Sequence, residues 1–157
     1  MMLTIDIPGR GTCSLRHIVL DYNGTIGFDG HLLPGVEERL NLLAEVLEVH
    51  IITADTFGLC RAACQSIKAR INILSDSLGG PQKDQFVQSL GPESVVAVGN
   101  GNNDALMLKR AAIGVAVLGQ EGASALALQA CDVVVRDIND GLDLFLKPKR
   151  LIATLRL

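Results

Sequence analysis

The sequence predicts an α/β fold: a Rossmann-like three-layer sandwich in which a mostly parallel sheet lies between two layers of helices. Short apolar runs rich in valine or isoleucine recur along the chain, and stretches with helical periodicity separate them. Such alternation is typical of parallel sheets, whose strands are joined by helical crossovers. The runs are mostly apolar along their length and the candidate site residues follow their C-terminal ends, which indicates a sheet covered by helices on both faces.

Six apolar runs are expected to form this sheet: 17–20, 49–52, 71–74, 95–98, 114–118 and 133–135. Helices are expected over 36–47, 59–69 and 123–130. Their starts follow from helix signals, because Pro34, Gly58 and Gly122 each come just before a stretch with apolar periodicity.

An N-terminal β-hairpin is expected before the first of these strands. Residues 3–7 and 13–20 read as extended segments, and the turn formers Pro8 to Gly11 lie between them. We expect this hairpin to add an extra strand to the edge of the sheet. A chain of 157 residues is in the usual range for one domain, so we expect a single domain over residues 1–157.

The composition limits the classes of protein to consider. Apolar residues make up 48% of the chain and charged ones 20%, which favours a globular core. The net charge is -3 and no basic run is longer than 147–150, so we expect neither nucleic acid nor a membrane as a partner. No window reaches about 18 consecutive apolar residues, and residues 1–10 do not resemble a secretion signal. We therefore expect a cytoplasmic protein whose four cysteines are reduced and buried as small hydrophobic residues.

Two strands end in residues that can take part in phosphoryl chemistry. Asp21 follows the run 17–20 and precedes an Asn-Gly turn, where a carboxylate can act as a nucleophile or a metal ligand. Thr53 follows the run 49–52, and its hydroxyl can bond a phosphoryl oxygen beside exposed backbone amides.

Two further residues complete the expected site. Lys83 lies in the predicted first turn of a helix, where its charge can offset that of phosphate and carboxylates. Asp104 closes the Gly/Asn-rich turn after the run 95–98 and opens the next helix. Because the carboxyl ends of parallel strands meet at one edge of a sheet, we expect Asp21, Thr53, Lys83 and Asp104 to form one magnesium- and phosphate-handling site.

Taken in this order, the four segments resemble the haloacid dehalogenase-like superfamily of phosphohydrolases and phosphotransferases over residues 18–135. Thr-Ala-Asp at 53–55 and Gly-Asn-Gly-Asn-Asn-Asp-Ala at 99–105 are similar to the Thr-Gly-Asp and Gly-Asp-Gly-x-Asn-Asp-Ala stretches of P-type ATPases. Only 27 residues separate Thr25 from Thr53, too few for the nucleotide-binding domain that such ATPases insert there, so ATP-driven transport is excluded.

The resemblance implies a core domain of this superfamily without a large cap. Residues 27–33 can form only a short flap, so the site should be open or covered by a neighbouring subunit in a homo-oligomer. The implied reaction begins when Asp21 attacks phosphorus and forms an aspartyl-phosphate, with Mg²⁺ as the cofactor. Lys83 would neutralise the charge that builds on the transferring oxygens, and Thr53 would help to hold them.

The resemblance also implies binding roles for individual residues. The implied metal ligands are Asp21, Asn23 through its backbone carbonyl, Asn100 and Asp104. The implied phosphate-binding residues are Asn23, Gly24, Thr53, Ala54 and Lys83. Asn103 and Thr25 are expected to support the site.

Two positions depart from the superfamily's pattern. Asn23 stands where its phosphatases place an Asp that protonates the leaving group and later activates water. Loss of such an acid/base typically costs about 10²–10⁴ in rate, so slow turnover is expected. Asn100 stands where the ATPase pattern has a metal-binding Asp, which predicts weaker Mg²⁺ binding.

The leading interpretation is a slow Mg²⁺-dependent phosphatase or phosphotransferase acting on a small phosphorylated substrate or a phosphoprotein. Its main alternative is a catalytically degenerate member that binds phosphate or a partner without turnover, as the two asparagines suggest. A third interpretation is a regulator or phosphoacceptor linked to an ATPase system, which rests on fold-level analogy alone.

Other polar residues have ordinary structural interpretations. Asp55 and Thr56 precede Gly58 and are expected to cap the following helix, with metal binding as the alternative. His17, His31 and His50 are scattered and form no HxxxH pair, so a zinc site is not expected.

Overall fold

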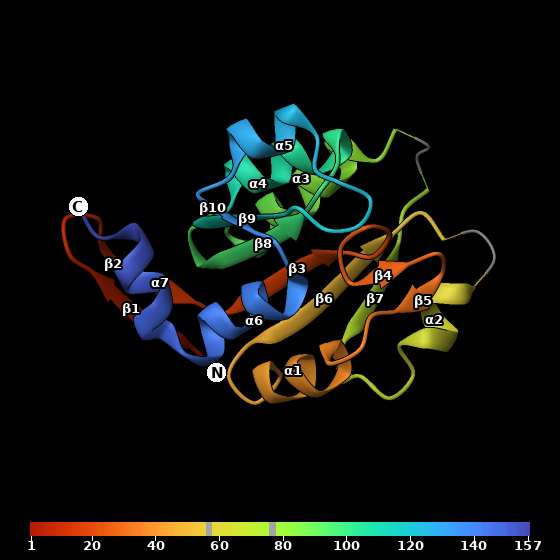
Figure 1. Cartoon of the computed structure of the whole chain (residues 1–157), viewed down its shortest axis with the longest axis horizontal. Helices are drawn as coiled ribbons and strands as arrows, with labels where there is room; N and C mark the ends of the chain where they lie inside the picture. Colours follow the sequence, from red (N-terminus) through yellow and green to blue (C-terminus); the bar gives the residue numbers. More distant parts are fainter. Residues whose placement is uncertain (56–57, 76–77) are drawn as a thin grey trace.

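The computed structural model describes residues 1–55, 58–75 and 78–157 (Figure 1). Its central sheet has the strand order β10-β9-β8-β3-β6-β7, and every neighbouring pair is parallel. The strands are β3 (His17–Asp21), β6 (Glu48–Thr53), β7 (Arg70–Ile73), β8 (Val95–Gly99), β9 (Ile113–Val117) and β10 (Val133–Val135). Each overlaps a run predicted from the sequence, so the predicted sheet is confirmed.

Helices cover both faces of this sheet. One face is covered by α1 (Val36–Leu43) and α6 (Ile138–Leu146), and the other by α3 (Gly80–Leu90), α4 (Ala105–Arg110) and α5 (Ala125–Ala130) (Figure 1). Buried side chains form one apolar core under each layer. The predicted three-layer α/β sandwich is therefore confirmed.

The alternation of side chains along β3 decides which layer its last residue faces. Ile18 and Leu20 belong to the core under α1 and α6, whereas Val19 belongs to the core under α3 and α4. Successive residues of a strand point to opposite faces, so Asp21 lies on the same face as Val19. The sequence thus directs the Asp21 carboxylate towards the layer that contains Lys83.

The N-terminal hairpin is present but does not join the central sheet. Strands β1 (Leu3–Ile7) and β2 (Gly11–Leu15) pair only with each other, so the expected extra edge strand was wrong. The run 13–20 divides at Arg16 into β2 and β3, and β3 is already flanked by β6 and β8. The hairpin instead packs against α7 (Pro148–Leu155) beyond the sheet (Figure 1).

The first two crossover helices are shorter than expected. Helix α1 ends at Leu43 and not at residue 47, and α2 (Leu59–Ala63) ends six residues before residue 69. In both cases the remaining residues turn the chain back to the N-terminal end of the sheet, where β6 and β7 begin. Strands β4 (Gly27–Phe28) and β5 (His31–Leu32) form a small antiparallel hairpin within the segment expected to be a flap.

Short 3-10 helices flank β8. They are η1 (Pro92–Ser94) before the strand and η2 (Asn102–Asp104) after it. In the part of the chain that the structure describes, no helix combines the length and the apolar character that a membrane span requires.

Candidate active site

Three buried charged residues meet at the C-terminal edge of the sheet. Asp21 ends β3, Asp104 ends η2, and Lys83 lies in the first turn of α3. Lys83 Nζ donates to Asp21 Oδ1 at 2.8 Å and to Asp104 Oδ1 at 2.7 Å. The exposed fractions are 7% for Asp21, 1% for Lys83 and 0% for Asp104, so the three charges depend on one another for compensation.

Asp104 binds Lys83 and also fixes the turn after β8. Its Oδ2 accepts hydrogen bonds from the backbone N–H groups of Asn100 and Gly101, both at 2.9 Å. A Cβ at Gly99 would lie 2.5 Å from the Asp104 Cγ, so only glycine lets the carboxylate approach the strand this closely. Both oxygens of Asp104 are therefore engaged inside the protein.

In the turn after Asp21, the backbone N–H and carbonyl of one residue are unpaired within the described ranges. The Tyr22 carbonyl accepts from three successive N–H groups, those of Thr25, Ile26 and Gly27, and the Gly24 N–H donates to the Gly27 carbonyl. The Gly24 amide, expected to bind phosphate, is thus used within the turn. The Asn23 N–H and carbonyl have no partner among residues 1–55, 58–75 and 78–157, and Asn23 is exposed. They remain available to a ligand.

Thr25 links the two sides of the site. Its fully buried hydroxyl lies 3.4 Å from Asp21 Oδ2 and 3.3 Å from Asn100 Oδ1. The Asn100 side-chain amide donates to the Gly122 carbonyl at 3.1 Å, which directs its oxygen towards Thr25. A hydroxyl has a single hydrogen, so it serves one of these two acceptors at a time. The supporting role expected for Thr25 is consistent with this geometry.

These residues border a pocket of about 260 Å³. Its lining residues are Asp21, Asn23, Ala54, Leu74, Gly79, Lys83, Asn100, Gly101 and Asn103. Thr53 is absent from this lining. It is 1% exposed, and its hydroxyl has no hydrogen-bonding partner within the described ranges. Thr53 has the same strand parity as Val49 and Ile51, whose side chains pack in the core under α1, so its side chain starts on the face opposite Lys83.

Burial and the nearby Asp104 raise the pKa of Asp21 to about 7, although Lys83 and Thr25 act in the opposite direction. Burial by itself would lower the pKa of Lys83, but Asp21 and Asp104 outweigh it, so the Lys83 pKa is raised. Two carboxylates thus share one ammonium group in a buried place. A bound cation would relieve this excess negative charge.

Several oxygens at the pocket suit a hard divalent cation, although those of Asp21 and Asn100 already contact Lys83 or Thr25. They belong to the Asp21 carboxylate, the Asn100 side-chain amide and the Asn23 backbone carbonyl. Carboxylate and carbonyl oxygens are the protein ligands that Mg²⁺ and Ca²⁺ prefer. Because Asp21 Oδ2 and Asn100 Oδ1 both lie beside the Thr25 hydroxyl, one ion can approach both.

The other sequence interpretations have mixed outcomes. Asp55 Oδ2 accepts from the Cys60 N–H at 2.7 Å, so its role in capping α2 is confirmed. Thr56 lies outside the described residues. The four cysteines are free thiols, but only Cys60 and Cys64 are buried.

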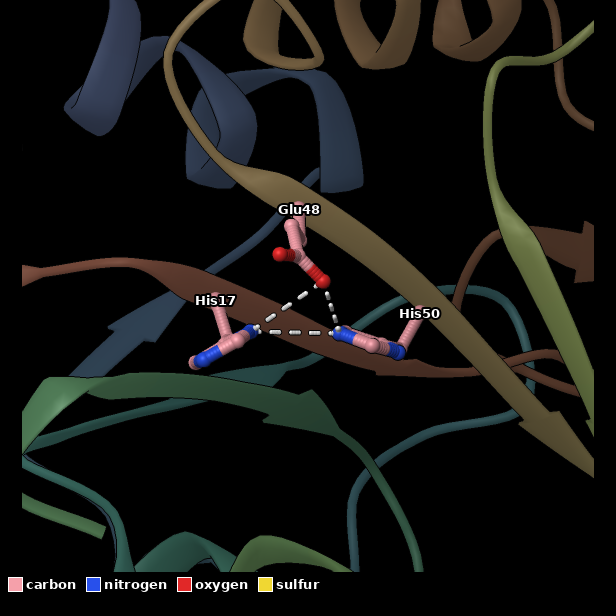
Figure 2. A group of neighbouring side chains, drawn as sticks. All are labelled: His17, Glu48 and His50. Atoms are coloured by element: carbon pink, nitrogen blue, oxygen red, sulfur yellow. Dashed lines mark hydrogen bonds and ion pairs between the residues drawn. The ribbon is translucent and has the colours of Figure 1, made fainter. Parts of the chain in front are cut away.

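One group of residues was missed. His17, Glu48 and His50 come together at the N-terminal ends of β3 and β6 (Figure 2). Treating His17 and His50 as unrelated was wrong, because the strand register places His17 directly beside Glu48. Glu48 lies before the predicted run 49–52, so no spacing along the chain shows that it meets His17. His31 lies apart from it, exposed on β5.

Comparison with known sequences finds a family model and curated relatives that match part of the chain. The family model described as haloacid dehalogenase-like hydrolase matches residues 87–143, which include β8, the Asn100–Asp104 turn and β9. An uncharacterized protein of Methanocaldococcus jannaschii is 52% identical over 64 residues, which span 41% of this chain and 69% of that protein.

Solved structures share the fold. A 3-deoxy-D-manno-octulosonate 8-phosphate phosphatase from Moraxella catarrhalis, solved with magnesium and phosphate ions, is 15% identical with a TM-score of 0.66, over 90% of this chain and 94% of that one. A zinc-transporting PIB-type ATPase is 23% identical with a TM-score of 0.63, over 78% of this chain but 20% of its own. The chain therefore belongs to the haloacid dehalogenase-like hydrolase superfamily.

Proposed function

We propose that this protein is a Mg²⁺-dependent phosphatase or phosphotransferase of low intrinsic rate that acts through an aspartyl-phosphate on Asp21. The observation that carries the proposal is the Asp21–Lys83–Asp104 network at the wall of the 260 Å³ pocket. The similar Moraxella structure, which contains magnesium and phosphate ions, supports it.

Asp21 is the proposed nucleophile. One of its oxygens attacks phosphorus, the bond from phosphorus to the leaving-group oxygen breaks, and the phosphoryl group remains on Asp21. Water or another acceptor then attacks the aspartyl-phosphate and restores the carboxylate. Lys83 holds Asp21 in place at 2.8 Å and offsets the negative charge on the transferring oxygens.

The phosphoryl oxygens have further proposed partners on the other side of the pocket. The unpaired Asn23 N–H and the amide of Ala54, which lines the pocket, supply donors there. Gly24 contributes through the shape of its turn, since its own amide is used by the Gly27 carbonyl. Thr53 as a phosphate ligand remains a prediction, because it would have to turn its hydroxyl towards the pocket.

Asp21, the Asn23 carbonyl and Asn100 would hold Mg²⁺. When bound, the cation offsets the repulsion between the carboxylate and the phosphate. Asp104 already receives Lys83 and two backbone amides, so we assign it to positioning Lys83 and closing the turn. Asn103 lines the pocket and would shape its entrance.

The low rate follows from Asn23. An amide side chain has no proton to give at neutral pH, so the leaving-group oxygen must take its proton from solvent. Good leaving groups, such as aryl or acyl phosphates, need that proton least. The substrate class is a small phosphorylated molecule or a phosphoprotein, admitted by an open pocket or one covered by a second subunit.

A second candidate function is supported by the same substitutions. With amides at both Asn23 and Asn100, the pocket could bind phosphate or a phosphorylated partner without turnover. The two functions differ in whether the phosphorus–oxygen bond breaks.

Hydrolysis of p-nitrophenyl phosphate with Mg²⁺ tests the proposal. Wild type should show slow turnover that Asp21→Ala abolishes, whereas the same change at the exposed Asp140 should leave the rate unaltered. Equal rates in wild type and Asp21→Ala would refute the role of Asp21. Saturable phosphate binding without any turnover would favour the second candidate.

A further inference from the structure

We propose that His17, Glu48 and His50 form a second metal site, specific for a transition cation of the Zn²⁺ class, at the N-terminal end of the sheet. The three side chains point towards one another across the start of β3 and β6 (Figure 2). The Asp21 pocket lies at the opposite end of the same two strands. The proposed site therefore does not belong to the phosphoryl-transfer machinery.

The distances fit a small ion with three protein ligands. His17 Nδ1 and His50 Nε2 are 3.3 Å apart, and Glu48 Oε2 is 3.8 Å from each of them. Zinc binds imidazole nitrogen at about 2.0–2.1 Å, so two ligands of a tetrahedral ion are roughly 3.4 Å apart. The two nitrogens already have this separation. Glu48, with 41% of its side chain exposed, needs only a small movement.

The backbone fixes this arrangement. His17 pairs with Glu48 and Val19 pairs with His50 in the parallel register of β3 and β6. Alternation along the strands places all three ligand side chains on the face that α3 covers. Phe86 of α3 packs edge-on against His50 with ring centroids 5.4 Å apart, and His50 is 2% exposed. One ligand is thus held by core packing before any metal binds.

The facing atoms of the two imidazoles are the ones that would bind the metal. His17 Nδ1 and His50 Nε2 face each other, and Glu48 Oε2 lies beside both. Metal ligation uses the neutral form of imidazole. Without a metal, the two facing nitrogens can be joined only by a hydrogen between them, which the cation would replace.

The surrounding charges leave room for a cation. Arg70 lies 3.7 Å from Glu48 Oε2, but its side chain is 74% exposed and can turn into solvent. Arg16 is the other nearby cationic group, and Glu48 offsets it at His17. The His50 Nδ1 atom is buried and has no partner in the described ranges, so packing against Phe86 and the contacts of Nε2 orient this ring.

The ligand types decide which metal binds. Two imidazoles and one carboxylate suit Zn²⁺, with water completing the coordination, whereas Mg²⁺ prefers oxygen ligands alone. The two ends of the strands would therefore hold different ions at the same time. A metal at this end would join β3 to β6 across their first residues.

The test is Zn²⁺ titration by calorimetry with the full chain in saturating Mg²⁺, which occupies the Asp21 pocket. Wild type should bind one Zn²⁺ per chain. His17→Ala should weaken binding by more than about 100-fold, beyond the 10–100-fold cost of losing a supporting group. Glu48→Gln keeps the size of a side chain that is 41% exposed and should weaken binding by about tenfold or more.

Two matched controls separate this site from others. His31→Ala removes an exposed histidine outside the group, and Asp21→Asn alters the other pocket, so both should retain wild-type Zn²⁺ binding. Co²⁺ should give visible absorption bands in wild type that His17→Ala loses. The proposal is overturned if wild type binds no Zn²⁺, if Glu48→Gln binds it as wild type does, or if Asp21→Asn abolishes binding.

Discussion

The two ends of strands β3 and β6 hold polar groups in contrasting ways. At the C-terminal end, Lys83 joins Asp21 to Asp104, and two backbone N–H groups donate hydrogen bonds to the other oxygen of Asp104. At the N-terminal end, His17, Glu48 and His50 converge, and the cationic side chain that pairs with Glu48, Arg70, is 74% exposed. The first group is organised around an internal cation, and the second has ligands for an external one.

The difference follows from what each end can reach. The carboxyl ends of parallel strands meet the N-terminal turns of helices, which deliver Lys83 and the amides after β8. The N-terminal end brings together the first residues of β3 and β6, with Phe86 of α3 beside His50 and Arg70 near Glu48. Oxygen donors thus gather at one end and imidazoles at the other, which separates hard cations from transition metals.

The largest expected effect comes from restoring an acid/base at the C-terminal end. Asn23→Asp should raise hydrolysis of p-nitrophenyl phosphate by about 10²–10⁴, because a carboxyl group can protonate the leaving oxygen and activate water. Steady-state rates with Mg²⁺ measure this. If the variant is no faster than wild type, the missing proton donor does not explain the low rate.

Removal of the internal cation should be the next largest effect. Lys83→Met leaves Asp21 and Asp104 buried without compensation, and breaking such a network costs about 3–5 kcal/mol of unfolding free energy. Urea unfolding measures the loss. Arg110→Gln, which breaks an exposed ion pair to Asp84 at 2.9 Å, is the matched control and should change stability little. Equal losses in the two variants would contradict the central role of Lys83.

Restoring the acid at residue 100 should sharpen the contrast between the metal sites. Asn100→Asp adds a carboxylate beside Asp21 Oδ2 and should strengthen Mg²⁺ binding about tenfold, since ligand charge sets affinity for hard cations. Zn²⁺ binding at the other end should not change. Isothermal titration with each ion tests both statements, and a parallel gain for Zn²⁺ would mean that the ends are not independent.

Much of the sheet and of the site around Asp21 could be predicted from the sequence, because the motifs lie at strand ends. The position of Asp21 after a buried run and that of Asp104 in a Gly/Asn turn placed them at one edge of the sheet. Burial of Lys83 could not be predicted, since a lone lysine in a first helical turn is usually solvated. Thr53 was placed in the pocket on the same reasoning as Asp21, but strand parity gives it the opposite face.

The N-terminal end could not be predicted from spacing along the chain. His17 and Glu48 are neighbours only through the β3–β6 register, which depends on how the whole sheet aligns. The wrong prediction that the N-terminal hairpin extends the central sheet has a similar cause. The run 13–20 was read as one extended segment although Arg16 and His17 interrupt its apolar pattern, and only the position of β3 between two neighbours shows that its extension cannot lie at an edge.

The smallest expected effect is a difference in pH dependence. The pKa of Asp21 is raised from 3.8 to about 7 by folding, so its contribution to stability is present below pH 3.8 and is lost as pH rises to 7. The pKa of His50 is lowered from 6.5 to about 4, so its contribution grows as pH rises from 4 to 6.5. The two trends oppose each other in metal-free wild type.

As pH rises from 4 to 6.5, the unfolding free energy of Asp21→Asn should therefore increase more steeply than that of wild type. Urea unfolding of both proteins in a metal chelator, at half-unit steps of pH, measures the two slopes. Identical slopes would show that Asp21 does not titrate as its burial requires.

The central claim is that Asp21 accepts a phosphoryl group, and intact-mass spectrometry tests it most directly. Wild type incubated with acetyl phosphate and Mg²⁺ should gain the mass of one phosphoryl group, located on the peptide that contains Asp21 and removed by hydroxylamine. Asp21→Asn should gain none. A wild type without any adduct, or an adduct that persists in Asp21→Asn, would contradict the account.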